Sequence, residues 1–317
     1  MTSPTVLNES SVAKLLPLID VQATLRNVFA QLAANKAVQP AQTTTLFPNG
    51  QGDFITYQGL IENDRVFGAK LSPYIAAEDG ATVTAWTCLM SMETGLPLLL
   101  CDSAILTIER TAGTTALAVD LLSKPESKSI AIIGSGKVAL AHWKYVENMR
   151  DWNTIKLWSS HLQENAQTRQ KWSKTCPQIE FCDSAEAAAK YADVILLCTS
   201  SGSPVLETGA IGNGTLVTSI SSNVKHAHEV QPEFLNHAQV YCDYRETTPA
   251  SAGEMVIAGR DYGWNVNSLV GDLPELVTKQ CTIPNFKAPI FFRSLGLGLE
   301  DIAIANQIHL FHTNQQN

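Results

Sequence analysis

A glycine-rich segment carries the clearest chemical signal in this chain of 317 residues. Four apolar residues, Ile130–Ile133, run directly into Gly134-Ser-Gly136-Lys-Val-Ala139, which has G-x-G-x-x-A spacing. Gly134 permits a tight turn, Gly136 lets a pyrophosphate approach the backbone, and Ala139 allows a following helix to pack closely on the strand. The amino end of that helix offers N–H donors to a phosphate. We therefore expect a dinucleotide site formed by Gly134, Ser135, Gly136, Lys137, Val138 and Ala139, although strand–turn–helix units without a ligand share this pattern.

Apolar strands and helices alternate in the part of the chain that follows the motif. Strands are expected at Thr154–Trp158, Glu180–Cys182, Asp193–Cys198, Leu216–Ser219 and Gln239–Cys242. The run Asp193–Cys198 is almost wholly apolar, which is typical of a parallel strand that is covered on both faces. This alternation predicts an α/β fold with a doubly wound parallel Rossmann sheet.

The part of the chain before the motif has a different pattern. Residues 11–35 show helical spacing of apolar residues with a break at Pro17, and residues 43–102 alternate like strands of an antiparallel meander. Helix 106–122 leads into the motif, and the tail Phe291–Phe311 has the pattern of a long apolar helix that returns to the first region. The sequence therefore predicts a Rossmann domain at 124–288, inserted in a discontinuous α+β domain formed by 1–123 and 289–317.

Composition and charge narrow the classes of partner. The net charge is -8 and no run of lysine or arginine occurs, so nucleic acid and anionic membranes are not expected partners. The segment MTSPTVLNES lacks the basic and apolar regions of a signal peptide, and no apolar run reaches the ~20 residues of a membrane span. Seven cysteines without a CxxC pair argue against a disulfide framework and a zinc ribbon. These features favour a cytoplasmic protein with reduced thiols.

Four segments together resemble the ornithine cyclodeaminase/mu-crystallin family along nearly the whole chain. They are Phe67–Pro73, Glu109–Thr114, Gly134–Ala139 and Phe292–Asp301. The resemblance implies a substrate-binding and dimerisation domain made from both chain ends, an inserted Rossmann domain and a homodimer. It also implies an NAD(P)-dependent cyclodeaminase, amino-acid dehydrogenase or imine reductase, because these are the activities of the family.

The resemblance assigns two cations to the carboxylate of the substrate. Lys70 matches the family lysine that holds this carboxylate, and Arg110 matches the arginine that pairs with it bidentately. A small 2-imino acid needs cations at its carboxylate, and a lysine on a strand is rigidly placed. The alternatives are a surface lysine at Lys70 and a salt bridge of Arg110 with Glu109 or Asp120.

Two departures from the family pattern change the expected reaction. Gln42 stands where the cyclodeaminases carry an arginine, and Asn223 stands where they carry an acidic residue beside the nicotinamide. An amide cannot act as a general base, so ornithine cyclodeamination is disfavoured. Gln42 and Asn223 are therefore expected substrate contacts that hydrogen-bond without charge.

The expected reaction is hydride transfer to a C=N bond that is already formed. Segments Tyr241–Tyr244 and Ala252–Met255, with the tail from Phe292, resemble the Δ1-pyrroline-2-carboxylate reductase branch of the family. This implies reduction of that small cyclic imino acid to L-proline, and of Δ1-piperideine-2-carboxylate to L-pipecolate. An alanine-type or N-alkyl amino-acid dehydrogenase is the enzymatic alternative, and a mu-crystallin-like binding protein is the non-enzymatic one.

The residues after the second Rossmann strand indicate which cofactor is used. An acidic residue there selects NAD, whereas Trp158 is followed by Ser159, Ser160 and His161, which tolerate a 2′-phosphate. NADPH is therefore the expected cofactor, with NADH as the alternative. Further cofactor contacts are expected at Thr111, Thr199, Ser200, Ser222 and Ser294.

Two remaining features concern local structure. His226-x-His228 has no evident third ligand, so no metal is expected. The resemblance implies that a helix starts at His228 and Glu229, and Thr111 is expected near the start of helix 106–122.

Overall fold

The computed structural model describes residues 4–76, 82–221 and 226–316. The chain forms two compact units, Met1–Arg110 with Gly296–Asn317, and Thr111–Leu295. These boundaries differ from the expected ones at 123/124 and 288/289. The reason is that the second half of helix α3 (Ala104–Leu122) and strand β16 (Ile290–Arg293) have their hydrogen-bonded partners in the second unit.

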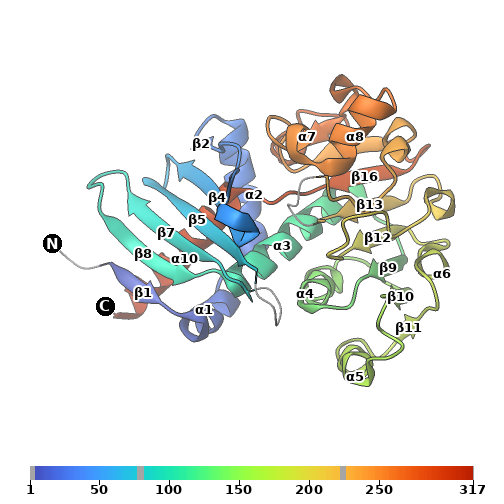
Figure 1. Cartoon of the computed structure of the whole chain (residues 1–317), viewed down its shortest axis with the longest axis horizontal. Coiled ribbons are helices and arrows are strands. Elements are labelled where there is room, and N and C mark those ends of the chain that lie inside the picture. The colour runs from blue at the N-terminus through green and yellow to red at the C-terminus, as the bar shows by residue number, and fades with distance from the viewer. Residues whose placement is uncertain (1–3, 77–81, 222–225, 317) are drawn as a thin grey trace. The chain divides into compact units, whose positions relative to one another are not determined.

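A largely antiparallel sheet forms the centre of the first unit (Figure 1). Its strands are β1 (Thr5–Leu7), β2 (Ala37–Val38), β3 (Thr43–Leu46), β4 (Gly52–Ile61), β5 (Val66–Ile75), β6 (Thr82–Val83), β7 (Trp86–Ser91) and β8 (Pro97–Asp102). They follow the order β1-β8-β7-β5-β4-β2, with β3 beside β4 and β6 beside β5. Strand β1 is parallel to β8, and the pairs β8–β7, β7–β5 and β5–β4 are antiparallel, so the expected meander is present.

Helices pack against one face of this sheet. Helix α10 (Gly298–Gln316) packs on β4, β5 and β7 and on helix α2 (Val21–Ala33). Helix α1 (Glu9–Leu15) lies against β8. Pro17 lies in a 3-10 turn, Leu16–Leu18, that separates α1 from α2, because proline fixes φ and lacks an N–H. Helices from both ends of the chain therefore cover the same sheet.

A parallel sheet runs through the second unit (Figure 1). Its strands are β9 (Ser129–Ile133), β10 (Thr154–Trp158), β11 (Ile179–Phe181), β12 (Val194–Leu197), β13 (Leu216–Ser219), β14 (Gln239–Cys242), β15 (Gly271–Asp272) and β16. The helices between them are α4 (Lys137–Val146), α5 (Ala166–Thr175), α6 (Ala185–Ala189), α7 (Thr248–Ser251), α8 (Gly253–Asp261) and α9 (Leu273–Val277). The order β11-β10-β9-β12-β13 reverses direction at β9 and β12, as in doubly wound dinucleotide-binding sheets. The predicted Rossmann architecture is confirmed.

The carboxy-terminal segment differs from the expected long helix. Residues Ile290–Arg293 form β16, which is inserted between β13 and β14, and α10 begins only at Gly298. All four residues of β16 are buried. A short apolar run fits a doubly covered strand as well as a buried helix, so its hydrophobicity did not distinguish the two. The prediction of a helix from Phe291 was wrong.

The described part of the chain contains no helix that is long and apolar enough to cross a membrane. All seven cysteines are free thiols. Burial, together with the negative charge of Glu229, raises the pKa of the Cys198 thiol well above its ordinary value. Because the thiolate is the reactive form, Cys198 is unsuited to act as a nucleophile.

Candidate active site

Two cations and two carboxylates form a buried charged cluster in the first unit. The Lys70 ammonium lies 2.9 Å from Asp301 Oδ2 and donates to Thr107 Oγ1 at 3.3 Å. Arg110 donates through Nε to Asp301 Oδ1 at 3.3 Å and through Nη1 to Glu300 Oε2 at 3.1 Å. The four charged side chains are almost fully buried. Asp301 therefore joins both cations, and the charged cluster of Lys70, Arg110, Glu300 and Asp301 is neutral overall.

Burial affects the two cations differently. Desolvation lowers the pKa of Lys70 to about 8, although the Asp301 carboxylate opposes this change. Desolvation also acts to lower the pKa of Arg110, but the carboxylates of Asp301 and Glu300 outweigh it and raise that pKa. The Lys70 ammonium lies 4.3 Å from the centre of the Tyr57 ring, which favours its charged form. Arg110 thus stays charged at any accessible pH, whereas Lys70 loses its proton in mildly alkaline solution.

The backbone before α10 explains how Arg110 fits into the charged cluster. Gly296 has a φ of +78°, and a Cβ at this position would lie 1.9 Å from Arg110 Nη1. Only glycine therefore admits the guanidinium. The two acids of the charged cluster lie in the first turn of α10, where the positive end of the helix dipole stabilises carboxylates. The N–H of Leu299 donates to Gln39 Oε1 at 2.9 Å, which satisfies one open group of that turn.

The charged cluster was only partly anticipated. Arg110 pairs with Glu300 and Asp301, which lie 190 and 191 residues away along the chain, whereas Glu109 and Asp120 were the expected alternatives. The local pattern assigns no role to Glu300. Its position beside Asp301 in the family segment Phe292–Asp301 is the signal that could have identified it. Gln42 is half-buried between β2 and β3, and its contact with a substrate stays a prediction.

The glycine motif forms the expected turn between β9 and α4. Gly134 has a φ of +112°, and a Cβ there would lie 2.4 Å from the carbonyl oxygen of Cys198. A Cβ on Gly136 would meet no atom within 4 Å. Gly136 is the N-cap of α4 and contributes no side-chain hydrogen bond, so the first N–H groups of the helix are available to an anion. The turn therefore fits a phosphate group at the amino end of α4.

Hydrogen bonds hold this turn beside the next strand. Ser135 Oγ lies 2.8 Å from Ser159 Oγ, directly after β10, and Trp172 Nε1 donates to the Ser135 carbonyl at 3.0 Å. Ser160 and His161 follow and are exposed. The structure thus brings these residues to the same sheet edge as the glycine motif, at the carboxyl ends of the strands, where such sheets bind ligands.

Replacing Gly136 by aspartate is expected to weaken dinucleotide binding roughly 100-fold while the fold is retained, because like-charge contacts cost several kcal/mol. The open space admits the side chain, and the carboxylate would accept from the N–H groups of α4 and repel a phosphate. Fluorescence titration with NADPH and NADH measures the affinity, and thermal unfolding checks the fold. Gly136→Asn is the control, because its side chain can also accept from the N–H groups of α4 but carries no charge. The difference between the two variants therefore measures the effect of the charge. An unchanged affinity in Gly136→Asp would mean that the phosphates bind elsewhere.

Other expected cofactor contacts lie at the carboxyl ends of β12 and β16. Thr199 is half-buried just after β12, and Ser200 is exposed. Ser294 follows β16, is buried and donates to Asp243 Oδ2 at 3.2 Å. The hydroxyl of Ser294 therefore has a protein partner, and its contact with a cofactor stays a prediction.

Several expectations about local structure need correction or lie beyond the described ranges. Thr111 is in the middle of α3, because that helix begins at Ala104 rather than Leu106. No helix starts at Glu229, which lies buried in an irregular segment before the 3-10 turn Pro232–Asn236. Ser222 and Asn223 lie outside the described residues. Within the described ranges, no group of histidine, cysteine, aspartate and glutamate side chains has an arrangement that could hold a metal ion.

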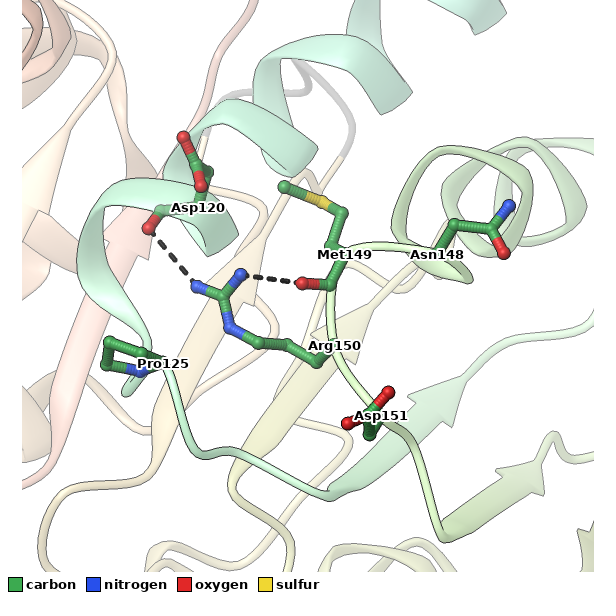
Figure 2. Close-up of a pocket in the computed structure, with 6 residues that line it drawn as sticks. All are labelled: Asp120, Pro125, Asn148, Met149, Arg150 and Asp151. Atoms are coloured by element: carbon green, nitrogen blue, oxygen red, sulfur yellow. Dashed lines mark hydrogen bonds between the residues drawn. The ribbon is translucent and has the colours of Figure 1, made fainter.

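A polar hollow of about 390 Å³ lies near the amino ends of β9 and β10 (Figure 2). It is lined by Asp120, Pro125, Asn148, Met149, Arg150 and Asp151. Figure 2 shows the Arg150 guanidinium donating to the carbonyls of Asp120 at 3.3 Å and Met149 at 2.9 Å. It also donates to the Lys124 carbonyl at 3.1 Å. Arg150 thus satisfies carbonyls around the end of α3, and the hollow lies at the strand ends opposite to those that bind ligands.

A model of the ornithine cyclodeaminase/mu-crystallin family matches residues 3–314. The NAD(P)H-dependent anabolic L-arginine dehydrogenase DauB of Pseudomonas aeruginosa is 49% identical over 307 residues, which cover 97% of each protein. The structure of Thermococcus litoralis Δ1-pyrroline-2-carboxylate reductase with NADH and L-proline has a TM-score of 0.91 at 22% identity, covering 98% of both chains. An archaeal alanine dehydrogenase dimer with bound NAD has a TM-score of 0.90 at 20% identity, covering 99% of this chain and 97% of the other.

Proposed function

Because the chain belongs to the ornithine cyclodeaminase/mu-crystallin family, we propose that it is an NAD(P)H-dependent oxidoreductase that reduces the C=N bond of a 2-imino acid. The relative that is 49% identical supports this reaction class. The observation that carries it is the buried pair Lys70 and Arg110, which supplies two positive donors for one substrate carboxylate.

The charged cluster performs the binding part of this reaction. When bound, the nicotinamide supplies a hydride to the imine carbon, and the nitrogen takes up one proton so that an amine forms. The planar guanidinium of Arg110 suits a bidentate grip on the substrate carboxylate. Lys70 adds a second positive charge below its pKa of about 8. Asp301 contacts both cations and so sets the distance between them.

We assign the substrate to the 2-imino acid of a basic amino acid with a long side chain. The support is the L-arginine dehydrogenase that matches this chain over 97% of its length. In the reductive direction, ammonia condenses with the ketone of a 2-oxo acid, water leaves, and the resulting imine is reduced to the amino acid. The sequence left open an alanine-type or N-alkyl amino-acid dehydrogenase, and the basic side chain of the substrate is proposed from this relative alone.

A second candidate substrate is the cyclic imine Δ1-pyrroline-2-carboxylate, which would yield L-proline. The segments Tyr241–Tyr244 and Ala252–Met255, which resemble the reductase branch of the family, favour it. Its C=N bond is already formed, so no ammonia is consumed. Reduction of Δ1-piperideine-2-carboxylate to L-pipecolate belongs to the same candidate.

The residues directly after β10, beginning with Ser159, support NADPH as the cofactor, with NADH as the alternative. No acidic side chain directly follows β10, and Ser160 and His161 are exposed after Ser159. A carboxylate at this position would repel a 2′-phosphate, whereas hydroxyl and imidazole groups do not.

The test of the reaction is a panel of substrates, followed through the absorbance of NADPH and of NADH. The panel holds 5-guanidino-2-oxopentanoate with ammonia, Δ1-pyrroline-2-carboxylate alone, and pyruvate with ammonia or methylamine. Rapid oxidation of the cofactor in the presence of the guanidino acid and ammonia supports the basic substrate. Rapid oxidation of the cofactor with the cyclic imine alone supports the second candidate. Binding of NADPH without turnover of any substrate would contradict the proposed reaction and favour a mu-crystallin-like binding protein.

We also propose that the outer face of the first unit's sheet joins two copies into a homodimer. Leu71 points away from the buried Lys70 and lies opposite Trp86 in register, and Val6 lies opposite Leu100. These four apolar side chains are between 37% and 63% exposed. Adjacent exposed apolar residues are typical of a protein interface. The archaeal alanine dehydrogenase of the same fold is a dimer.

A charge on this face is expected to separate the two copies. Leu71→Glu places a carboxylate among apolar side chains, and we expect it to give a monomer in size-exclusion chromatography with light scattering. The control is Tyr191→Glu, at a position that is 85% exposed in the second unit. A dimer that persists in Leu71→Glu would exclude this face as the interface.

A further inference from the structure

A fully buried glutamate joins the ends of two neighbouring strands of the parallel sheet. Glu229 Oε1 accepts hydrogen bonds from Thr199 N at 2.9 Å and from Thr199 Oγ1 at 2.7 Å. Its Oε2 accepts from Ser219 Oγ at 2.8 Å and from Ile220 N at 3.1 Å. Thr199 lies just after β12, and Ser219 is the last residue of β13. One carboxylate therefore holds the carboxyl ends of both strands.

The hydrogen bonds of Glu229 continue through the segment that follows β12. Thr199 Oγ1 accepts from Ser201 N at 3.1 Å, and Ser201 Oγ donates to the Ser203 carbonyl at 2.7 Å. The backbone carbonyl of Glu229 accepts from Val205 N at 2.9 Å. Segment 199–205 is thus connected to Glu229 at both of its ends, which restricts its conformation.

We propose that Glu229 is a positioning residue for the cofactor, acting through Thr199 and Ser200. The inference rests on the cofactor site proposed above. Ligands of doubly wound sheets bind beyond the carboxyl ends of the strands at the point where the strand order reverses, and β12 lies at that point. Ser200 is exposed and so accessible to a ligand, whereas Glu229 is completely buried. Glu229 therefore acts by fixing the strand ends rather than by touching the cofactor.

An amide cannot replace the Glu229 carboxylate. Each carboxylate oxygen accepts two hydrogen bonds, and each set contains a backbone N–H. Glutamine has the same shape but presents an NH₂ group in place of one oxygen. In either orientation of the amide, this NH₂ group faces the N–H of Thr199 or of Ile220. Glu229→Gln is therefore expected to release one strand end without leaving a cavity.

A carboxylate at the amino ends of strands in the same sheet offers a control. Asp193, directly before β12, accepts through Oδ2 from Lys128 N at 2.8 Å, from Ser129 N at 2.9 Å and from Ser129 Oγ at 2.8 Å. This carboxylate also joins two neighbouring strands, but at their amino ends, away from the expected ligand position. Asp193→Ala removes these acceptors and should destabilise the sheet without changing the cofactor site.

The experiment compares wild type, Glu229→Gln and Asp193→Ala by thermal unfolding, by NADPH titration and by steady-state kinetics. We expect both variants to unfold at a lower temperature. We expect only Glu229→Gln to raise the KM for NADPH about tenfold and to lower kcat by up to about 100-fold, because a small misplacement of reacting groups has an effect of this size. Thr199→Val, which removes one donor to Glu229, should give a smaller change that is not additive with Glu229→Gln.

The outcomes separate this inference from the proposed function. If wild type binds NADPH and Glu229→Gln behaves like Asp193→Ala, with kcat and the KM for NADPH unchanged, Glu229 has a structural role only and the inference is overturned. If the effects of Thr199→Val and Glu229→Gln are additive, Glu229 does not act on the cofactor through Thr199. If wild type binds neither NADPH nor NADH, the cofactor site itself is refuted, and the inference falls with it.

Discussion

Replacing Arg110 by methionine is expected to lower kcat/KM for the imine roughly 100- to 1000-fold, because the substrate carboxylate loses its bidentate partner. The same change leaves Glu300 and Asp301 with Lys70 as the remaining cation of the charged cluster. An uncompensated buried charge costs about 3–5 kcal/mol of unfolding free energy, so the variant should also be much less stable. Steady-state kinetics and urea unfolding measure the two effects.

A double variant separates loss of stability from loss of substrate binding. Arg110→Met with Glu300→Gln restores a balanced pair of Lys70 and Asp301. We expect this variant to recover most of the stability but none of the activity, while NADPH affinity is unchanged in both variants. If Arg110→Met reduces the imine with the kcat/KM of wild type, Arg110 does not bind the substrate carboxylate, and its pairs with Glu300 and Asp301 are structural.

Replacing Asp301 by asparagine is expected to move the alkaline limb of the kcat/KM profile to lower pH by about 1–3 pH units, the size of the effect of a nearby opposite charge. Burial lowers the pKa of Lys70 to about 8, and Asp301 opposes that change. Without the Asp301 charge, burial and Arg110 lower the pKa of Lys70 further. Lys70 is charged only below its pKa, so the variant should lose activity at neutral pH and recover it in acid. The pH dependence of kcat/KM measures this limb in the free enzyme.

Glu300 supplies the control for this pH experiment. Its carboxylate contacts Arg110 in the charged cluster and contributes less than Asp301 to the pKa of Lys70. Glu300→Gln should therefore shift the alkaline limb less than Asp301→Asn. No shift in either variant would show that the ionisation of Lys70 does not control the alkaline limb. Equal shifts would contradict the dominant effect of Asp301 on the pKa of Lys70.

Most of the fold followed from local patterns. The alternation of apolar strands and helices after Ile133 predicted the parallel sheet, and the break at Pro17 separates two helices as expected. The apolar residues from Phe291 onward predict a helix, but Ile290–Arg293 is a strand buried between β13 and β14. Burial on both faces removes the alternation of polar and apolar residues by which a strand is recognised. A doubly covered strand therefore looks like part of a buried helix.

The sequence by itself determined which residue types are present for the chemistry: the glycine motif that starts at Gly134, and the cations Lys70 and Arg110. Motif and resemblance are enough for this, because a tight turn before a helix requires glycine at particular spacings and a carboxylate requires cations. Tertiary structure alone decided the partners of these groups. Arg110 meets Glu300 and Asp301 from the other end of the chain, and Glu229 holds two strand ends. Such contacts depend on which residues lie close together in space and on how deeply they are buried. Burial strengthens each electrostatic interaction and hydrogen bond, and local spacing in the sequence does not encode these distances.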